Sequence, residues 1–170
     1  MAEILEAFTP GSPIDDKDLF AGRKRQREKL ISTIFQKGEH AILLGERGVG
    51  KTSLANIVYD WLQIMGKFNY RRAKVNCASG MSFDDIWRTA FNQITFENPD
   101  GETLTLDGAL PKNPTSENIR ETFQLMNDRS IIIIDELDKI GDKRVQRRLA
   151  DTVKTLSDNA IGTTLIMVGV

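Results

Sequence analysis

The fold of this chain is decided by residues 40–53, which read HAILLGERGVGKTS. The apolar run from His40 to Gly45 predicts a strand, and the residues after Lys51 predict a helix with apolar side chains on one side. The turn between them is rich in glycine, which permits positive φ angles and directs backbone N–H groups toward a common centre. The following helix adds the positive end of its dipole. Strand, turn and helix therefore predict an anion-binding site.

The turn matches the GxxxxGKT pattern of nucleotide-binding P-loops. In that pattern Lys51 reaches the β- and γ-phosphates, and the hydroxyl of Thr52 binds the Mg²⁺ that bridges them. A glycine turn that merely joins a strand to a helix is the alternative, but it gives no reason for a lysine and a hydroxyl at the helix start. We therefore expect ATP and Mg²⁺ as cofactors. The candidate nucleotide-binding residues are Gly45, Glu46, Arg47, Gly48, Val49, Gly50, Lys51, Thr52 and Ser53, with the side chains of Glu46 and Arg47 expected to be exposed loop charges.

An acidic pair follows the apolar run SIIIID, which ends at Asp135. Four consecutive isoleucines predict a strand buried on both faces of a parallel sheet. At the end of a neighbouring parallel strand, Asp135 would lie on the same edge as the glycine turn and hold Mg²⁺ directly or through a water. Glu136 beside it could orient and deprotonate an attacking water, so Glu136 and Lys51 are the candidate catalytic residues. Many strands end in acidic residues at the water boundary, and the glycine turn upstream favours the functional interpretation.

Short apolar strands alternate with amphipathic segments, which predicts an α/β fold with the parallel sheet and three-layer sandwich of P-loop NTPases. We expect an extended N-terminal segment over residues 1–19, a P-loop ATPase domain over 20–170, and a surface insertion at about 96–113, where turn signals gather. An apolar strand ends the sequence, so the last strand and lid of such a domain are expected to be missing. The predicted strands are 40–45, 73–77, 130–135 and 163–170, and the predicted helices are 23–37, 54–65, 83–94, 115–126 and 144–157.

The composition limits the range of functions. With 40% hydrophobic residues and a net charge of -1, the chain gives no global electrostatic reason to expect nucleic acid or an anionic membrane as the partner. It has no basic leader followed by an apolar stretch and no apolar run of ~18 residues, so the cytoplasm is the expected location. Cys77 is the only cysteine, which excludes an internal disulfide and a cysteine zinc cluster. His40 is the only histidine, and we assign it no chemistry.

The stretches GERGVGKTS and IIIIDELD together resemble the AAA+ and STAND branch of P-loop ATPases, in the ASCE division, and the resemblance covers nearly the whole chain. Upstream, Phe20, Gly22 and Arg23 in FAGR resemble the FxGR box of the origin-initiator-like and STAND members. That box lies against the adenine in such proteins, which implies that these three residues contact adenine or ribose. A solvated helix start is the alternative for this basic segment. The resemblance also places a sensor residue and the lid beyond Val170, so we expect weak binding and slow hydrolysis.

Three functions stay open from the sequence. The first is an ATP-hydrolysing AAA+-like domain that drives nucleotide-dependent conformational change, and Glu136 favours it. The second is a STAND-type switch in signalling or defence with little turnover, and the third is a P-loop kinase, against which the adjacent acidic pair and the FAGR box count. The expected partners are ATP or ADP, and a homo-oligomer or a downstream effector domain. Nucleic acid stays open because of the basic residues Lys143, Arg144, Arg147 and Arg148, but the net charge does not support it, and no membrane partner is expected.

Overall fold

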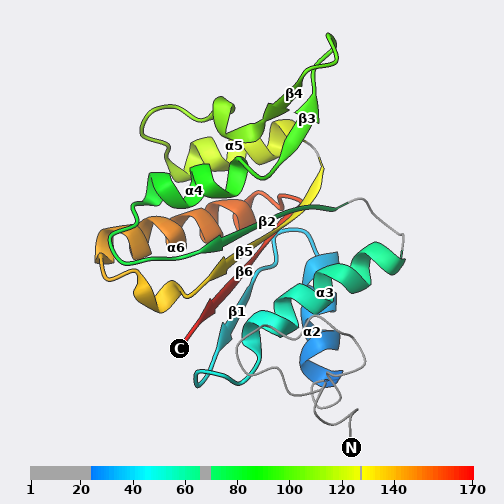
Figure 1. The fold of residues 1–170 in the computed structure, drawn as a ribbon, viewed down its shortest axis with the longest axis vertical. Coiled ribbons are helices and arrows are strands. Elements are labelled where there is room, and N and C mark those ends of the chain that lie inside the picture. The colour runs from blue at the N-terminus through cyan, green and yellow to red at the C-terminus, as the bar shows by residue number, and fades with distance from the viewer. Residues whose placement is uncertain (1–23, 66–69, 127) are drawn as a thin grey trace, which may run out of the picture.

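A four-stranded parallel sheet forms the centre of the computed structural model, which describes residues 24–65, 70–126 and 128–170 (Figure 1). The strand order is β1-β6-β5-β2, and all three pairings are parallel. The fold class predicted from the sequence is therefore confirmed. The strands are β1 (Ala41–Leu44), β2 (Tyr70–Asn76), β5 (Arg129–Asp135) and β6 (Thr163–Gly169).

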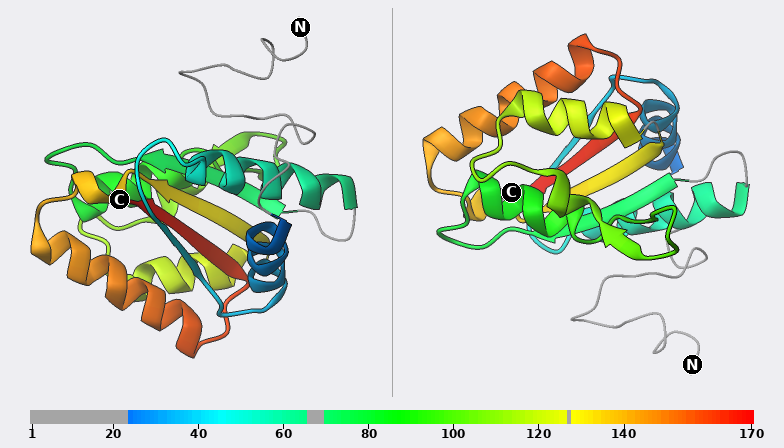
Figure 2. Two further views of the ribbon diagram at one scale, coloured as in Figure 1. Left: turned by 90° about the horizontal axis from the view of Figure 1, so that it is seen from below. Right: turned by 90° about the horizontal axis from the view of Figure 1, so that it is seen from above.

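Helices cover both faces of this sheet, so the molecule has three layers (Figure 2). One face packs against α2 (Lys24–Phe35) and α3 (Lys51–Met65). The other face packs against α4 (Phe83–Phe91), α5 (Ser116–Met126) and α6 (Lys143–Asp158). Parallel strands require such crossovers, because each strand must start again at the same end of the sheet.

The isoleucine run of β5 explains why this strand lies inside the sheet. Ile131 and Ile133 belong to the core on the α2 and α3 side, whereas Ile132 and Ile134 belong to the core on the α4, α5 and α6 side. All four side chains are 0% exposed. Full burial of one such side chain contributes about 1.5–3 kcal/mol, so the run fixes β5 between both helical layers. The acidic pair that follows is thereby held at one edge of the sheet.

The segment 96–113 is partly core, which its turn signals do not indicate. It contains a two-stranded antiparallel hairpin of β3 (Thr95–Glu97) and β4 (Thr103–Thr105), followed by the short helix η2 (Leu106–Ala109). Leu106 and Leu110 are only 6% and 8% exposed and pack into the core beneath α4 and α5. The hairpin projects from the molecule, but the residues after it close one end of the core (Figure 1).

His40 has a structural role that the sequence did not suggest. It directly precedes β1, and its ring Nδ1 accepts a hydrogen bond from the backbone N–H of Leu165 in β6 at 3.0 Å. Burial lowers the pKa of His40 to about 4, and the Val153 backbone carbonyl opposes that shift. The ring is therefore neutral at pH 7 and acts as an acceptor that continues the pairing of β1 with β6.

The folded protein should lose stability as the pH falls from about 6.5 toward about 4. In this window the unfolded chain binds more protons than the folded chain, because folding lowers the pKa of His40; above it both states are neutral and the penalty is absent. The variant His40→Asn keeps an acceptor for Leu165 without a group that titrates here. The free energy of unfolding in urea is measured at about pH 7.5 and about pH 5, and it should fall more in the wild type than in His40→Asn. The difference between the two falls should stay below about 1.4 kcal/mol per pH unit, the limit for one proton. Equal losses in both proteins would contradict this role.

Candidate functional site

The glycine loop joins β1 to α3 with the backbone geometry that an anion site needs. Gly48 and Gly50 have φ angles of 79° and 77°, a region that side chains with a Cβ rarely adopt. A Cβ at Gly48 would meet no atom within 4 Å, so the backbone angle rather than space requires glycine there. The helix α3 begins at Lys51 without an acidic residue in its first turn. Its first N–H groups lack acceptors within the helix, and they therefore favour an anion.

The ammonium group of Lys51 lies against the loop that precedes it. Its Nζ donates hydrogen bonds of 2.7 Å to the backbone carbonyls of both Gly45 and Glu46. These two carbonyls hold the positive charge at the start of α3, where the loop amides and the helix dipole also act. A phosphate at this position would find three sources of positive potential in one place.

Asp135 reaches the same place from the end of β5. We expected its strand to be the direct neighbour of β1, but this expectation is wrong, because β6 lies between the two strands. The carboxyl ends of parallel strands share one edge, so the loop and α3 still span the intervening strand. The hydroxyl Oγ1 of Thr52 donates a hydrogen bond of 2.9 Å to Oδ2 of Asp135. The structure thus brings together the two residues that the sequence suggests as metal ligands.

Glu136 is held in an unusual backbone conformation next to Asp135. Its φ angle is 55°, which costs a non-glycine residue about 1–3 kcal/mol. Its N–H donates to Oδ1 of Asp135 at 2.9 Å, which orients the neighbouring carboxylate. Its own carboxylate accepts a 2.7 Å hydrogen bond from Lys139, at the end of the short helix η3 (Leu137–Lys139). Lys139 therefore pairs with the candidate base.

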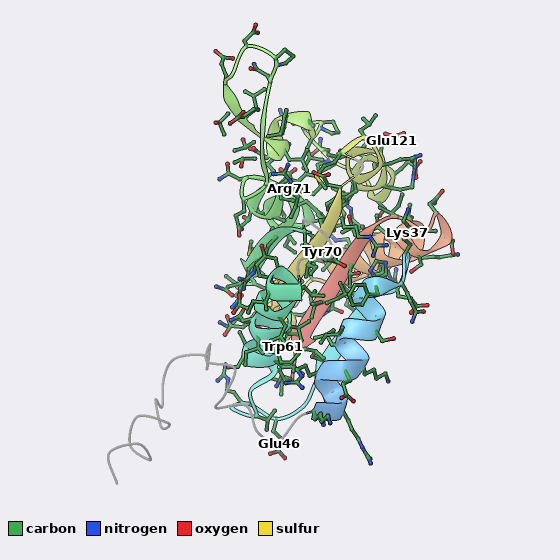
Figure 3. The ribbon with its side chains drawn as sticks, turned by 90° about the vertical axis from the view of Figure 1, so that its right-hand side faces the viewer. Lys37, Glu46, Trp61, Tyr70, Arg71 and Glu121 are labelled. Atoms are coloured by element: carbon green, nitrogen blue, oxygen red, sulfur yellow. The ribbon has the colours of Figure 1, made fainter. Side chains whose placement is uncertain are left out.

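The remaining predicted site residues differ in how they are placed. Glu46, Arg47 and Val49 are exposed on the loop, and Ser53 is buried at the start of α3. Figure 3 shows Glu46 at the end of the molecule opposite Arg71 and Glu121. The proposed adenine neighbours Phe20, Gly22 and Arg23 lie outside the residues that the structure describes.

Lys74 is a residue of this site that sequence reasoning missed. It lies in β2, and its Nζ is 3.4 Å from Oδ2 of Asp135. The only signal for it in the sequence is its position between Ala73 and Val75, two residues with apolar side chains. Cys77, two residues beyond Val75, is 1% exposed. Burial, together with the charges of Asp135 and Glu136, raises the pKa of its thiol to about 11. The thiol is therefore protonated at pH 7, which agrees with a small buried side chain rather than a nucleophile.

The donor set fits a magnesium ion that is shared with a nucleotide. Mg²⁺ prefers oxygen ligands and in nucleotide sites takes only one or two from the protein, the rest coming from phosphates and waters. The Thr52 hydroxyl and the Asp135 carboxylate supply that number at one point. Over residues 24–65, 70–126 and 128–170, no group of three or more His, Cys, Asp or Glu side chains is placed to form an all-protein metal centre.

The parallel sheet with its strand, glycine loop and helix defines a P-loop NTPase-like domain. Residues 35–170 match the family model described as AAA domain. The chain therefore belongs to this family of ATPase domains. None of the curated proteins matches the sequence.

Solved structures with this fold include a Walker-type ATPase of Pyrococcus abyssi, with a TM-score of 0.60, 15% identity, and coverage of 93% of this chain and 47% of that chain. The Drosophila ORC, solved bound to DNA, has a TM-score of 0.56, 18% identity, and coverage of 87% of this chain and 38% of that chain. At these identities the likeness concerns the fold. The chain spans less than half the length of either protein. In the described ranges, none of the helices has the length and apolar character needed to cross a membrane.

Replacement of Thr52 should separate metal binding from phosphate binding. The variant Thr52→Val lacks the hydroxyl, so we expect the Mg²⁺-dependent gain in ADP affinity to fall by about 10–100-fold, because a ligand and a charge-assisted hydrogen bond are both lost. Binding of ADP in EDTA should change little, since loop amides and Lys51 remain. Thr52→Ser keeps the hydroxyl and should behave as the wild type. Calorimetric titrations with and without Mg²⁺ measure this, and an unchanged Mg²⁺ gain in the valine variant would rule out the assigned role.

Proposed function

We propose that this chain binds ATP with Mg²⁺ at the glycine loop and hydrolyses it to drive a conformational change. The observation that carries this proposal is the 2.9 Å hydrogen bond from Thr52 to Asp135. It gathers a hydroxyl and a carboxylate at the start of α3, the helix that begins at Lys51, although they come from separate parts of the sheet edge. Two oxygen ligands next to a phosphate-binding cation are what a magnesium nucleotide requires.

Each residue has a defined task in the proposed reaction. The loop amides and Lys51 bind the β- and γ-phosphates and stabilise negative charge that develops during the transfer. Thr52 and Asp135 hold the metal, and Mg²⁺ when bound neutralises charge on the phosphate oxygens. Glu136 orients the attacking water and accepts its proton. Adenine contacts by Phe20, Gly22 and Arg23 stay a prediction.

Lys139 holds one oxygen of the Glu136 carboxylate, the group proposed as the base. The 2.7 Å contact occupies Oε2, an oxygen that would otherwise be available to an attacking water. Rotation of the Lys139 side chain frees this oxygen. In the proposed hydrolysis, separation of the pair makes Oε2 available to the attacking water, so the rate is lower when the pair is populated.

The same contact favours a second candidate function, a STAND-type nucleotide switch with little turnover. In that function the Glu136–Lys139 pair keeps catalysis low, and the bound nucleotide itself determines the conformation. The steady-state rate of phosphate release distinguishes the two functions. An ATPase releases phosphate repeatedly, whereas a switch keeps its bound nucleotide and releases phosphate slowly. No contact among the described residues favours the third possibility, a kinase. Either function would act on a further domain or a second copy.

Lys51→Ala should abolish ATP binding. The ammonium is the one side-chain cation assigned to the phosphates, and charge-assisted hydrogen bonds contribute about 1.5–3 kcal/mol each, so we expect a loss of affinity of 100-fold or more (about 2.7 kcal/mol). Calorimetry with ATP and Mg²⁺ measures this loss. Lys154→Ala, which removes an exposed lysine of α6, is the matched control. If Lys51→Ala binds as tightly as the control, the glycine loop is not the nucleotide site.

Glu136→Gln should bind ATP as the wild type does but fail to hydrolyse it. The amide cannot accept the proton of the attacking water, and loss of a general base lowers the rate by about 10²–10⁴-fold. Phosphate release and ATP affinity are measured on the same preparation. A variant that hydrolyses ATP at the wild-type rate would remove Glu136 from the mechanism, and one that no longer binds ATP would indicate a structural role.

A further inference from the structure

Lys74 places a second cation on the carboxylate that is assigned to the metal. Its Nζ lies 3.4 Å from Oδ2 of Asp135, the same oxygen that accepts the hydrogen bond of Thr52. The side chain of Asp135 is 7% exposed and that of Lys74 is 23% exposed. Water therefore screens this ion pair weakly, and the attraction is stronger than that of a surface pair.

The backbone of Lys74 is fixed by the side chain of Gln93, which lies just after α4. β2 is an edge strand, and the amide of Gln93 takes the place of a further strand beside it. Gln93 accepts a hydrogen bond from the N–H of Lys74 at 2.9 Å and donates one of 2.8 Å to its carbonyl. The neighbouring side chains of Ala73 and Val75 are 1% and 0% exposed in the core. Only the flexible four-carbon stem of Lys74 is free to move its ammonium.

Other nearby cations have partners of their own. Arg72, on the same face of β2, donates to Asn56 at 2.7 Å and lies over the ring of Tyr59 at 4.6 Å. Lys139 is paired with Glu136. The charge on Asp135 is therefore balanced by Lys74, and a divalent cation that approaches this carboxylate meets an ammonium already in contact with it.

We propose that Lys74 is an internal cation that competes with Mg²⁺ for Asp135 and so sets the Mg²⁺ concentration at which the nucleotide site is completed. This inference rests on the proposed function. Two cations cannot share one poorly screened carboxylate oxygen without strong repulsion, so binding of the metal drives the ammonium of Lys74 away. By linkage, the contact between Lys74 and Asp135 lowers the affinity of the site for Mg²⁺ by the same factor by which bound Mg²⁺ weakens that contact. A purely structural ion pair would stabilise the fold and leave the metal requirement unchanged.

The experiment measures the Mg²⁺ concentration for half-maximal thermal stabilisation at saturating ADP. Lys74→Met removes the charge, and we expect it to lower this midpoint by about tenfold, which corresponds to about 1.4 kcal/mol of coupling. Lys74→Gln keeps a hydrogen-bond donor for Asp135 without the charge, should shift the midpoint in the same direction, and serves if the methionine variant folds poorly. Lys74→Arg restores the charge and should return the midpoint to within about threefold of the wild type.

A matched control comes from the same strand. Arg71→Met breaks an ion pair with Asp128 at 3.0 Å, at the far end of β2 from the glycine loop (Figure 3). It should lower stability without shifting the Mg²⁺ midpoint. An unchanged or higher midpoint in both uncharged Lys74 variants overturns the proposal. Weaker ADP binding by these variants in EDTA also overturns it, because Lys74 would then contact the phosphates.

A wild-type chain that Mg²⁺ and ADP fail to stabilise would refute the proposed function, which is a different result. The wild type and Lys74→Met are then compared for binding of Mn²⁺ alone. The relaxation rate of water protons reports this binding. Tighter Mn²⁺ binding by Lys74→Met than by the wild type supports the competition. Equal or weaker Mn²⁺ binding overturns it.

Discussion

The hydrogen bond from Thr52 to Asp135 joins parts of the chain that lie 83 residues apart, and the geometry of the candidate site depends on it. Both ends are anchored in the core. Asp135 ends a strand with four fully buried isoleucines, and Thr52 lies one turn of helix before Asn56 and close to the fully buried Leu54 of α3. Neither group can shift without disturbing close-packed side chains. The bond therefore fixes the distance between the glycine loop and the acidic pair across the intervening strand.

The acidic pair is balanced by two lysines from different elements. Asp135 contacts Lys74 of β2, and Glu136 contacts Lys139 of η3. Burial of a carboxylate such as Asp135 is costly unless it is paired and hydrogen-bonded. Lys74 supplies the paired charge, and Thr52 supplies a hydrogen bond. These contacts occupy the same oxygens that nucleotide chemistry would use. Stability of the protein alone and readiness of the site for metal and water are therefore in opposition at this edge of the sheet.

The sequence predicts what depends on neighbouring residues and misses what depends on tertiary contacts. The glycine loop and the isoleucine strand could be located because turn geometry and burial on both faces leave local patterns. The place of β6 between β1 and β5 could not, since strand order is decided by how crossovers pack. Lys74 was missed because its ion pair needs a partner from another element, Asp135 of β5. Leu106 and Leu110 were missed because two apolar residues in a turn-rich stretch give no periodicity. The roles of the site residues stay predictions.

The amide of Gln93 has a consequence for how this protein meets other chains. An exposed edge strand offers unpaired backbone groups to another polypeptide, and non-specific pairing of this kind leads to aggregation. At Lys74 both backbone groups of that edge are already engaged by one side chain, and Arg71 at the other end of the strand reaches across to the carbonyl of Thr95. A foreign strand would have to displace these contacts before it could add to the sheet. These contacts therefore hinder the addition of a strand to the outer side of β2, and they keep a foreign strand away from Lys74 beside the candidate metal site.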